Sequence, residues 1–358
     1  MVVASEYDRA AIAGKERSKP PDIITTRQPS ASGGAELYLE WLKASFENSR
    51  IPSQIRGFSG SKKLASWIKA LLFNKEARAK KAPDELYFSL ARIDSSDIYR
   101  TDDGVHRVYR KSKKFWWLNP INFIHPYLEK KCFENAKCII AISQMVKKQI
   151  IECYSVPESK IEVLYNGAEF PKKIDKKSAK KQLCTRLELD ESEPLVLFVG
   201  SGFKRKGVKE LLLALSEQKS AYNALFVGKD KQLERYKNLA KSLGVKAHFL
   251  GASDGASEYF EACDILALLS VYEPFGLVVL EAMSYGCAVI ASDKCGAAEL
   301  LDREFIASDS ACASKILAGL LTNSQKLKGA GLKNRQKAKE HSLEANVKAQ
   351  IELVRRYL

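Results

Sequence analysis

Continuously apolar segments of strand length alternate with helical segments over the second half of this chain. The strand-length segments cover residues 195–201, 224–228, 246–251, 265–270 and 288–292. The segments between them carry apolar residues at helical spacing, as Leu211, Leu212 and Leu215 do. A strand that is apolar along its whole length is typical of a parallel sheet covered by helices on both faces. The alternation therefore predicts a Rossmann-like α/β domain over residues 183–340.

The first half repeats this pattern less clearly. Apolar runs at 22–27, 138–143 and 161–167 predict strands. Residues 48–95 contain no clear strand pattern. We expect a second, smaller Rossmann-like domain over residues 22–170.

Three segments fall outside the two predicted domains. Residues 1–21 match neither a strand nor a helix pattern, and we expect a flexible extension there. Residues 171–182 are polar and rich in lysine, which favours a linker. The last residues, 341–358, are expected to form a closing helix.

Composition narrows the class of protein. Of the 358 residues, 46% are hydrophobic and 28% are charged, as in ordinary globular proteins. The eight cysteines form no C-x-x-C pair and the four histidines are scattered, so no zinc site is predicted. We expect reduced cysteines and a cytoplasmic location. No apolar run approaches the length of a membrane span, and the N-terminus lacks the apolar core of a signal peptide.

The positive charge is concentrated in one region. The chain has a net charge of +15, and residues 51–150 carry 20 Lys and Arg against 9 Asp and Glu. Such asymmetry favours a polyanionic partner, which could be nucleic acid, anionic lipid or a phosphorylated saccharide. No recognised nucleic-acid motif accompanies the charge, so nucleic acid is not predicted as a partner.

The loop GSGFKRKG (200–207) lies between a predicted strand and a predicted helix over 206–217. Small residues such as Gly202 let backbone amides approach a ligand, and the positive end of a helix favours an anion. Arg205 and Lys206 add two cations, a combination that suits a diphosphate. The alternative is a plain turn with a solvated basic face.

A second loop, YEPFGLVVLEAMSYG (272–286), begins a helix soon after the strand at 265–270. Glu273 lies in the loop, and Glu281 lies about one turn along the helix. A carboxylate there can accept hydrogen bonds from paired hydroxyls, such as a ribose diol, while the loop amides hold phosphate. In the alternative, Glu273 is a helix cap and Glu281 an exposed charge.

These residues resemble the donor-site motifs of retaining glycosyltransferase family 4, which has the GT-B fold. The two carboxylates match the family's E-x7-E motif, and GSGFKRKGVKELLLAL matches its first donor loop. RTDDGVHRVY (100–109), VGKDK (227–231) and SGGAE (32–36) add to the likeness, which is greatest to lipopolysaccharide core glucosyltransferases of the RfaG/WaaG type. The resemblance implies two Rossmann-like domains facing across a cleft, with the C-terminal helix crossing back.

The resemblance also implies roles for individual residues. His106, Glu273 and Asp103 would lie at the reacting centre. The donor would be held by Gly33, Gly34, Gly202, Arg205, Lys206, Phe275, Gly276, Leu277 and Glu281. No Asp-x-Asp motif is present, so we expect transfer without a metal, and no cofactor besides the nucleotide diphosphate sugar as co-substrate.

A basic and aromatic stretch follows His106. It contains Arg107, Arg110, Lys111, Lys113, Lys114, Phe115, Trp116 and Trp117. Indole rings beside lysines are typical of a membrane–water interface, so we expect contact with an anionic membrane surface or the acceptor. The alternative is a helix whose aromatic residues face the core.

We therefore expect a hexosyltransferase that uses a UDP-sugar with retention. Its acceptor would be a lipid-linked or anionic saccharide, such as lipopolysaccharide core, at the inner face of the cytoplasmic membrane. Three alternatives stay open: a nucleotide-sugar 2-epimerase, a non-catalytic sugar-nucleotide-binding module, and a soluble glycogen or sucrose-type transferase. Nucleotide release only in the presence of an acceptor would exclude the epimerase, and a soluble transferase would show no affinity for anionic vesicles. The presence of Glu273, Glu281, Arg205 and Lys206 argues against a non-catalytic module.

Overall fold

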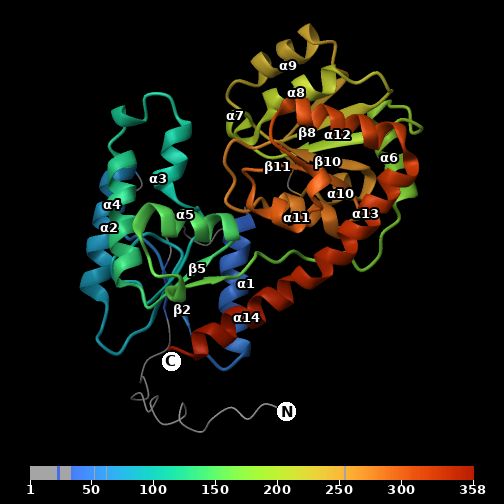
Figure 1. The fold of residues 1–358 in the computed structure, drawn as a ribbon. Helices are drawn as coiled ribbons and strands as arrows, with labels where there is room; N and C mark the ends of the chain where they lie inside the picture. The colour runs from blue at the N-terminus through green and yellow to red at the C-terminus, as the bar shows by residue number, and fades with distance from the viewer. Residues whose placement is uncertain (1–21, 25–33, 52, 62, 254) are drawn as a thin grey trace.

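The computed structural model describes residues 22–24, 34–51, 53–61, 63–253 and 255–358. The predicted extension (1–21) and Gly33 lie outside this part of the chain. The described residues form two six-stranded parallel sheets with helices packed around them (Figure 1). The predicted architecture of two Rossmann-like domains is confirmed.

The N-terminal sheet is built from short strands in the order β2-β1-β3-β4-β5-β6. Its strands are β1 (Asp22–Ile24), β2 (Gln54–Arg56), β3 (Tyr87–Ser89), β4 (Ile98–Arg100), β5 (Cys138–Ala141) and β6 (Ile161–Val163). The longer helices around it are α1 (Gly34–Asn48), α2 (Ser66–Lys80), α4 (Ile121–Asn135) and α5 (Gln144–Tyr154). β2 and β3 both lie within residues 48–95, where the sequence shows no strand pattern, so these two strands were not predicted. Strands of three residues are too short to display a period of two.

The C-terminal sheet has longer strands in the order β12-β11-β10-β7-β8-β9. Its strands are β7 (Leu195–Val199), β8 (Asn223–Val227), β9 (Ala247–Gly251), β10 (Ile265–Leu268), β11 (Ala288–Ser292) and β12 (Ile306–Ala307). Its helices include α6 (Lys176–Leu187), α8 (Val208–Ser216), α9 (Leu233–Ser242), α10 (Ser257–Ala262), α11 (Leu277–Ser284), α12 (Ser310–Thr322) and α13 (Ser324–Ala338). Leu197, Leu225 and Leu266, in the middle of three strands, are fully buried. All five predicted strands are present.

The last helix, α14 (Leu343–Arg355), runs from the C-terminal domain back to the N-terminal domain (Figure 1). Its Val347, Ile351 and Val354 join the same buried apolar cluster as Leu39 and Phe46 of α1. The predicted crossing back is confirmed. None of the described helices is long and apolar enough to span a membrane.

The lysine-rich segment 171–182 is partly helical, because α6 begins at Lys176. The Asp175 side chain caps this helix by accepting from the Ser178 amide. Lys180 pairs with Asp264 of the C-terminal domain at 2.8 Å. Residues 176–182 thus pack as part of that domain.

The two domains meet beyond the carboxyl ends of their strands. The Tyr272 hydroxyl, from the loop after β10, accepts a hydrogen bond from the Val105 amide of the N-terminal domain at 2.8 Å. Ser143 Oγ donates to the Pro274 carbonyl at 2.9 Å. In parallel α/β sheets, ligands bind at this edge, so the fold positions a site between the domains.

Candidate active site

A cavity of about 490 Å³ lies between the domains. Its N-terminal wall is lined by Arg92, Asp102, Asp103, His106, Tyr109 and His125, and its C-terminal wall by Arg205, Tyr272, Glu273 and Pro274. The three predicted catalytic residues, His106, Glu273 and Asp103, therefore line one cavity. Arg205 lines it as well, which brings a predicted donor-binding cation next to them.

The C-terminal wall is built around the carboxylate of Glu273. Its Oε2 lies 2.7 Å from Arg205 Nη1 and 2.5 Å from Lys206 Nζ. Glu273 and Lys206 are each 9% exposed, so the three charges are packed against one another at the cavity edge. The Glu273 backbone is held in turn, because its amide donates to the Lys294 carbonyl at 2.9 Å.

The prediction that a helix begins at residue 206 differs from the structure. A short helix, α7 (Phe203–Lys206), precedes α8, and Gly207 separates the two with φ of +75°. A Cβ at Gly207 would stand 1.8 Å from the Leu269 carbonyl oxygen. The Phe203 amide at the start of α7 donates to Asp230 Oδ2 at 2.7 Å. The positive charge available to an anion here is therefore that of the side chains of Arg205 and Lys206.

The helix α11 begins differently, with free amides. Gly276 precedes it with φ of +92°, and a Cβ there would meet Cys295 Sγ at 2.8 Å. No described residue accepts a hydrogen bond from the amides of Gly276, Leu277 or Val278. Phe275 itself is buried. This helix start has the character of an anion site.

Glu281 lies one turn along α11, where its carboxylate has no hydrogen-bond partner among the described residues. Burial raises the pKa of this carboxyl from 4.5 to about 7, although the charge of Lys206 opposes the rise. Lys206 thus acts on both carboxylates of the E-x7-E motif. The exposed-charge alternative does not fit a group whose pKa is raised by burial.

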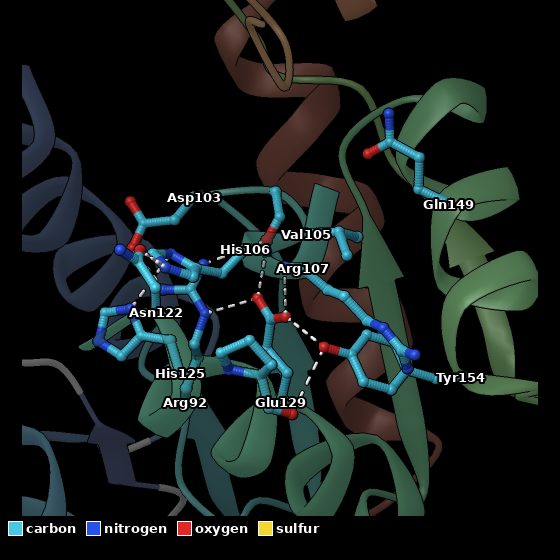
Figure 2. Close-up of polar contacts among 12 residues, drawn as sticks. Arg92, Asp103, Val105, His106, Arg107, Asn122, His125, Glu129, Gln149 and Tyr154 are labelled. Atoms are coloured by element: carbon cyan, nitrogen blue, oxygen red, sulfur yellow. Dashed lines mark hydrogen bonds and ion pairs between the residues drawn. The ribbon is translucent and has the colours of Figure 1, made fainter. Parts of the chain in front are cut away.

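The N-terminal wall rests on a buried ion pair that the sequence analysis missed. Arg92 Nε lies 2.9 Å from Glu129 Oε1, and Arg92 Nη1 lies 3.0 Å from Asp103 Oδ2. Glu129 is fully buried and also accepts from the His106 amide and the Tyr154 hydroxyl (Figure 2). In the sequence, the signal for this ion pair is Glu129, an acidic residue beside the apolar residues Leu128 and Cys132.

The His106 side chain is engaged within its own domain. Its Nε2 lies 2.8 Å from Asn122 Oδ1, and its Nδ1 lies 3.3 Å from Nδ1 of His125 (Figure 2). Burial lowers the pKa of His106, and the positive charge of Arg92 lowers it further. His106 is therefore a neutral ring in the cavity wall, and its predicted role at the reacting centre stays a prediction.

The basic and aromatic stretch forms an exposed surface between α3 (His106–Tyr109) and α4. Phe115 is 62% exposed and Trp117 is 54% exposed, which rules out the core alternative for both residues. Trp116 is half-buried beneath Arg110, whose guanidinium carbon lies 4.3 Å from the ring centre. The remaining predicted cations are exposed or half-buried, and they are Arg107, Lys111, Lys113 and Lys114.

Three residues absent from the prediction extend this surface. Leu118, Phe123 and Tyr127 are each at least half exposed. We call the exposed set formed by Phe115, Trp117, Leu118, Phe123 and Tyr127 the aromatic patch.

Of the predicted glycine-loop residues, Gly34 is the first residue of α1.

Family models match two parts of the chain. Residues 180–315 match the model of the group 1 glycosyl transferases, and residues 97–170 match the model of Glycosyltransferase Family 4. Together with the two parallel sheets, these matches show a protein with the GT-B fold whose C-terminal domain is similar to the group 1 glycosyl transferases and whose N-terminal domain is similar to Glycosyltransferase Family 4.

Relatives and solved structures agree with this class. An uncharacterized glycosyltransferase of Methanocaldococcus jannaschii is 31% identical over 46% of this chain and 45% of that protein. The lipopolysaccharide glucosyltransferase WaaG of Escherichia coli is 30% identical over 48% and 49%. The chain thus spans about half the length of these relatives.

The fold likeness is more extensive. A WaaG crystal structure superposes with a TM-score of 0.75 at 18% identity, covering 93% of this chain and 99% of that one. Anabaena HepE, solved in complex with UDP and glucose, gives a TM-score of 0.71 at 19% identity over 95% and 100%.

Proposed function

We propose that this protein transfers a hexose from a UDP-sugar to a lipid-linked saccharide. The observation that carries the proposal is the convergence of Arg205 and Lys206 on Glu273 at the mouth of the cavity, beside Glu281. Two cations suit a diphosphate, and two carboxylates suit sugar hydroxyls. HepE, which shares the fold, is known in complex with UDP and glucose.

Different residues of the site would bind different parts of the donor. The α11 amides at Gly276 and Leu277, with Arg205 and Lys206, would hold the diphosphate. Glu281 would accept from the ribose hydroxyls and Glu273 from the transferred sugar. As the bond to the sugar breaks, negative charge grows on the leaving phosphate, and fixed cations beside it stabilise that charge. We propose that transfer needs neither metal nor cofactor and retains the anomeric configuration.

We also propose that the aromatic patch places the enzyme on the anionic inner face of the cytoplasmic membrane. Exposed rings flanked by Lys111 and Lys114 support this part of the proposal. Each cation near an anionic surface contributes about 1 kcal/mol. The relative WaaG is named as a lipopolysaccharide glucosyltransferase, and a lipid-linked saccharide of that kind lies at a membrane.

A thermal-shift panel of nucleotides and nucleotide sugars, with and without EDTA, tests the donor site. A ligand at a hundred times its Kd stabilises the folded state by about 2.7 kcal/mol. We expect UDP and one UDP-sugar each to raise the melting temperature, by the same amount with EDTA as without it. A protein whose melting temperature responds to no nucleotide is not a transferase of this kind.

A UDP-release assay with and without a saccharide acceptor tests the alternatives. Release of UDP that does not depend on an acceptor would indicate the epimerase, and binding without turnover would indicate a binding module.

Co-sedimentation with anionic vesicles tests the membrane contact. We expect the double variant Phe115→Ala/Trp117→Ala to lose most of its vesicle binding. Leu332→Ala is the matched control, because Leu332 is 72% exposed on α13 of the other domain. Equal binding by the double variant and the control would contradict the docking surface, and no binding by the wild type would favour a soluble transferase.

A further inference from the structure

A second histidine, His125 of α4, stands in the wall of the cavity beside His106. The two rings meet edge to face, with centres 4.7 Å apart. His125 belongs to none of the motifs in the sequence, and the donor site described above does not use it.

The hydrogen bonds around the two rings determine where their protons lie. The Asn122 amide nitrogen donates to the Trp116 carbonyl at 2.7 Å, which turns Asn122 Oδ1 toward His106 Nε2. That nitrogen must therefore carry the proton and donate to Asn122. His106 Nδ1 is left as an acceptor, so the Nδ1 proton of His125 points at it over 3.3 Å. The free lone pair of His125 is consequently on Nε2.

The surroundings keep both rings neutral. Burial lowers the pKa of His125 to about 3, and the positive charge of Arg92 contributes to the shift. Of the other charged groups near the ring, Lys113 lowers the pKa further, whereas Asp103 raises it. A ring of this kind is too weak a base to take a proton at neutral pH, but it can accept a hydrogen bond.

No described residue donates to His125 Nε2. The ring lines the same cavity as Arg205 and Glu273, where we place the donor. Phe123 and Tyr127, two residues to either side along α4, are exposed on the other face of this helix. His125 belongs to the opposite domain from Arg205 and Glu273, so a second substrate that meets the donor in the cavity can contact Nε2 there.

We propose that Nε2 of His125 accepts a hydrogen bond from a hydroxyl of the acceptor saccharide, and that His106 is a positioning residue that orients the His125 ring. The inference rests on the proposed glycosyl transfer. It identifies His125 as a determinant of acceptor specificity, since a site built to bind one hydroxyl discriminates against a saccharide that lacks it.

Two substitutions of His125 separate substrate contact from support of His106. An asparagine amide reaches the place of Nδ1 but not of Nε2, whereas a glutamine amide reaches the place of Nε2. We expect His125→Asn to raise the acceptor KM about three- to tenfold, the loss of one neutral hydrogen bond, with the donor KM unchanged. His125→Gln should keep the acceptor KM within about twofold. The reverse order, or a change confined to the donor KM, would overturn the inference.

Acceptors lacking one hydroxyl at a time provide a second test that needs no comparison of variant stability. One such acceptor should bind less well than the parent to the wild type, yet equally well to His125→Asn. If each deoxy acceptor is penalised equally by both proteins, His125 contacts none of these hydroxyls. A wild type that neither binds UDP nor transfers sugar would overturn the proposed function itself, whereas one that does both while ignoring these changes overturns this inference alone.

Discussion

The two walls of the cavity handle charge in opposite ways. On the C-terminal wall, Arg205 and Lys206 share one oxygen of Glu273, and the Arg205 side chain is 36% exposed. On the N-terminal wall, Arg92 is 9% exposed and its partner Glu129 not at all. The C-terminal charges can exchange partners with a ligand, whereas the N-terminal pair is committed to the protein. The first wall suits a diphosphate and the second suits uncharged hydroxyls.

This difference follows from the cost of burying charge. A buried pair stabilises a fold only while both partners remain, because the survivor is left without compensation. Arg92 also lowers the pKa of His106 and His125, which keeps those rings neutral. The N-terminal pair thus contributes to the site through the groups it supports. Four substitutions test the contrast.

Removal of the buried carboxylate should have the largest effect. Glu129→Ala leaves Arg92 buried without its main partner, and we expect the free energy of unfolding to fall by about 3–5 kcal/mol. Urea denaturation measures the change. Glu134→Ala on the same helix is the control, because Glu134 is exposed and should change stability by less than about 0.5 kcal/mol. Similar losses for both variants would remove the distinction between the walls.

Glu273→Ala tests the exchangeable wall. We expect turnover to fall about a hundredfold, the loss expected when a charged group at the reacting centre is removed. UDP affinity should not fall, because Arg205 and Lys206 are released from Glu273 to bind phosphate. Steady-state kinetics and a UDP titration measure the two quantities. A fall in UDP affinity with unchanged turnover would reverse the assigned role.

Glu281→Gln should mainly weaken UDP binding, by about tenfold at pH 8, since a charged acceptor for the ribose hydroxyls is lost. The pKa of Glu281 is about 7 in the free protein, so the wild-type carboxyl becomes neutral as the pH falls below 7. The difference between wild type and variant should therefore shrink to about twofold near pH 6. Protonation of the UDP phosphates affects binding to the wild type and to the variant equally, so it does not change the difference between them.

The same pKa predicts the sign of the stability change. An unfolded glutamate ionises near 4.5, but folded Glu281 holds its proton up to about pH 7. The contribution of Glu281 to stability is therefore largest below pH 4.5 and is lost as the pH rises to 7. The free energy of unfolding of Glu281→Gln minus that of the wild type should therefore be larger at pH 8 than at pH 5. Equal pH profiles of melting temperature would contradict this account.

Tyr272→Phe tests how the walls are joined. Tyr272 belongs to the C-terminal wall, but its hydroxyl binds the Val105 amide and Gln149 of the other domain. Its loss should cost about 1–2 kcal/mol, because a buried amide loses its partner. Tyr127→Phe is the control, since Tyr127 is exposed. An unchanged thermal unfolding midpoint would show that this contact does not couple the domains.

The C-terminal domain could be predicted closely because each of its sequence signals lies within one short segment. The strands around Leu197, Leu225 and Leu266 are buried on both faces and read as apolar runs. Glu273 and Glu281 lie in one loop and the helix that follows it, so their spacing predicts their proximity. β2 and β3 of the N-terminal domain are three residues long and show no such pattern, so they were not predicted.

The two α/β domains, the donor motifs and the concentration of cations and aromatic residues around Trp117 could all be predicted from the residues and their order. The pairing of Arg92 with Glu129, 37 residues away, is visible only in the folded protein. The same holds for the contacts of His106 with Asn122 and His125, and for the contact of Tyr272 with Val105 across the domain boundary. Hydrophobic periodicity records which face of an element is buried, whereas the partner of a buried polar group depends on which elements the fold packs together.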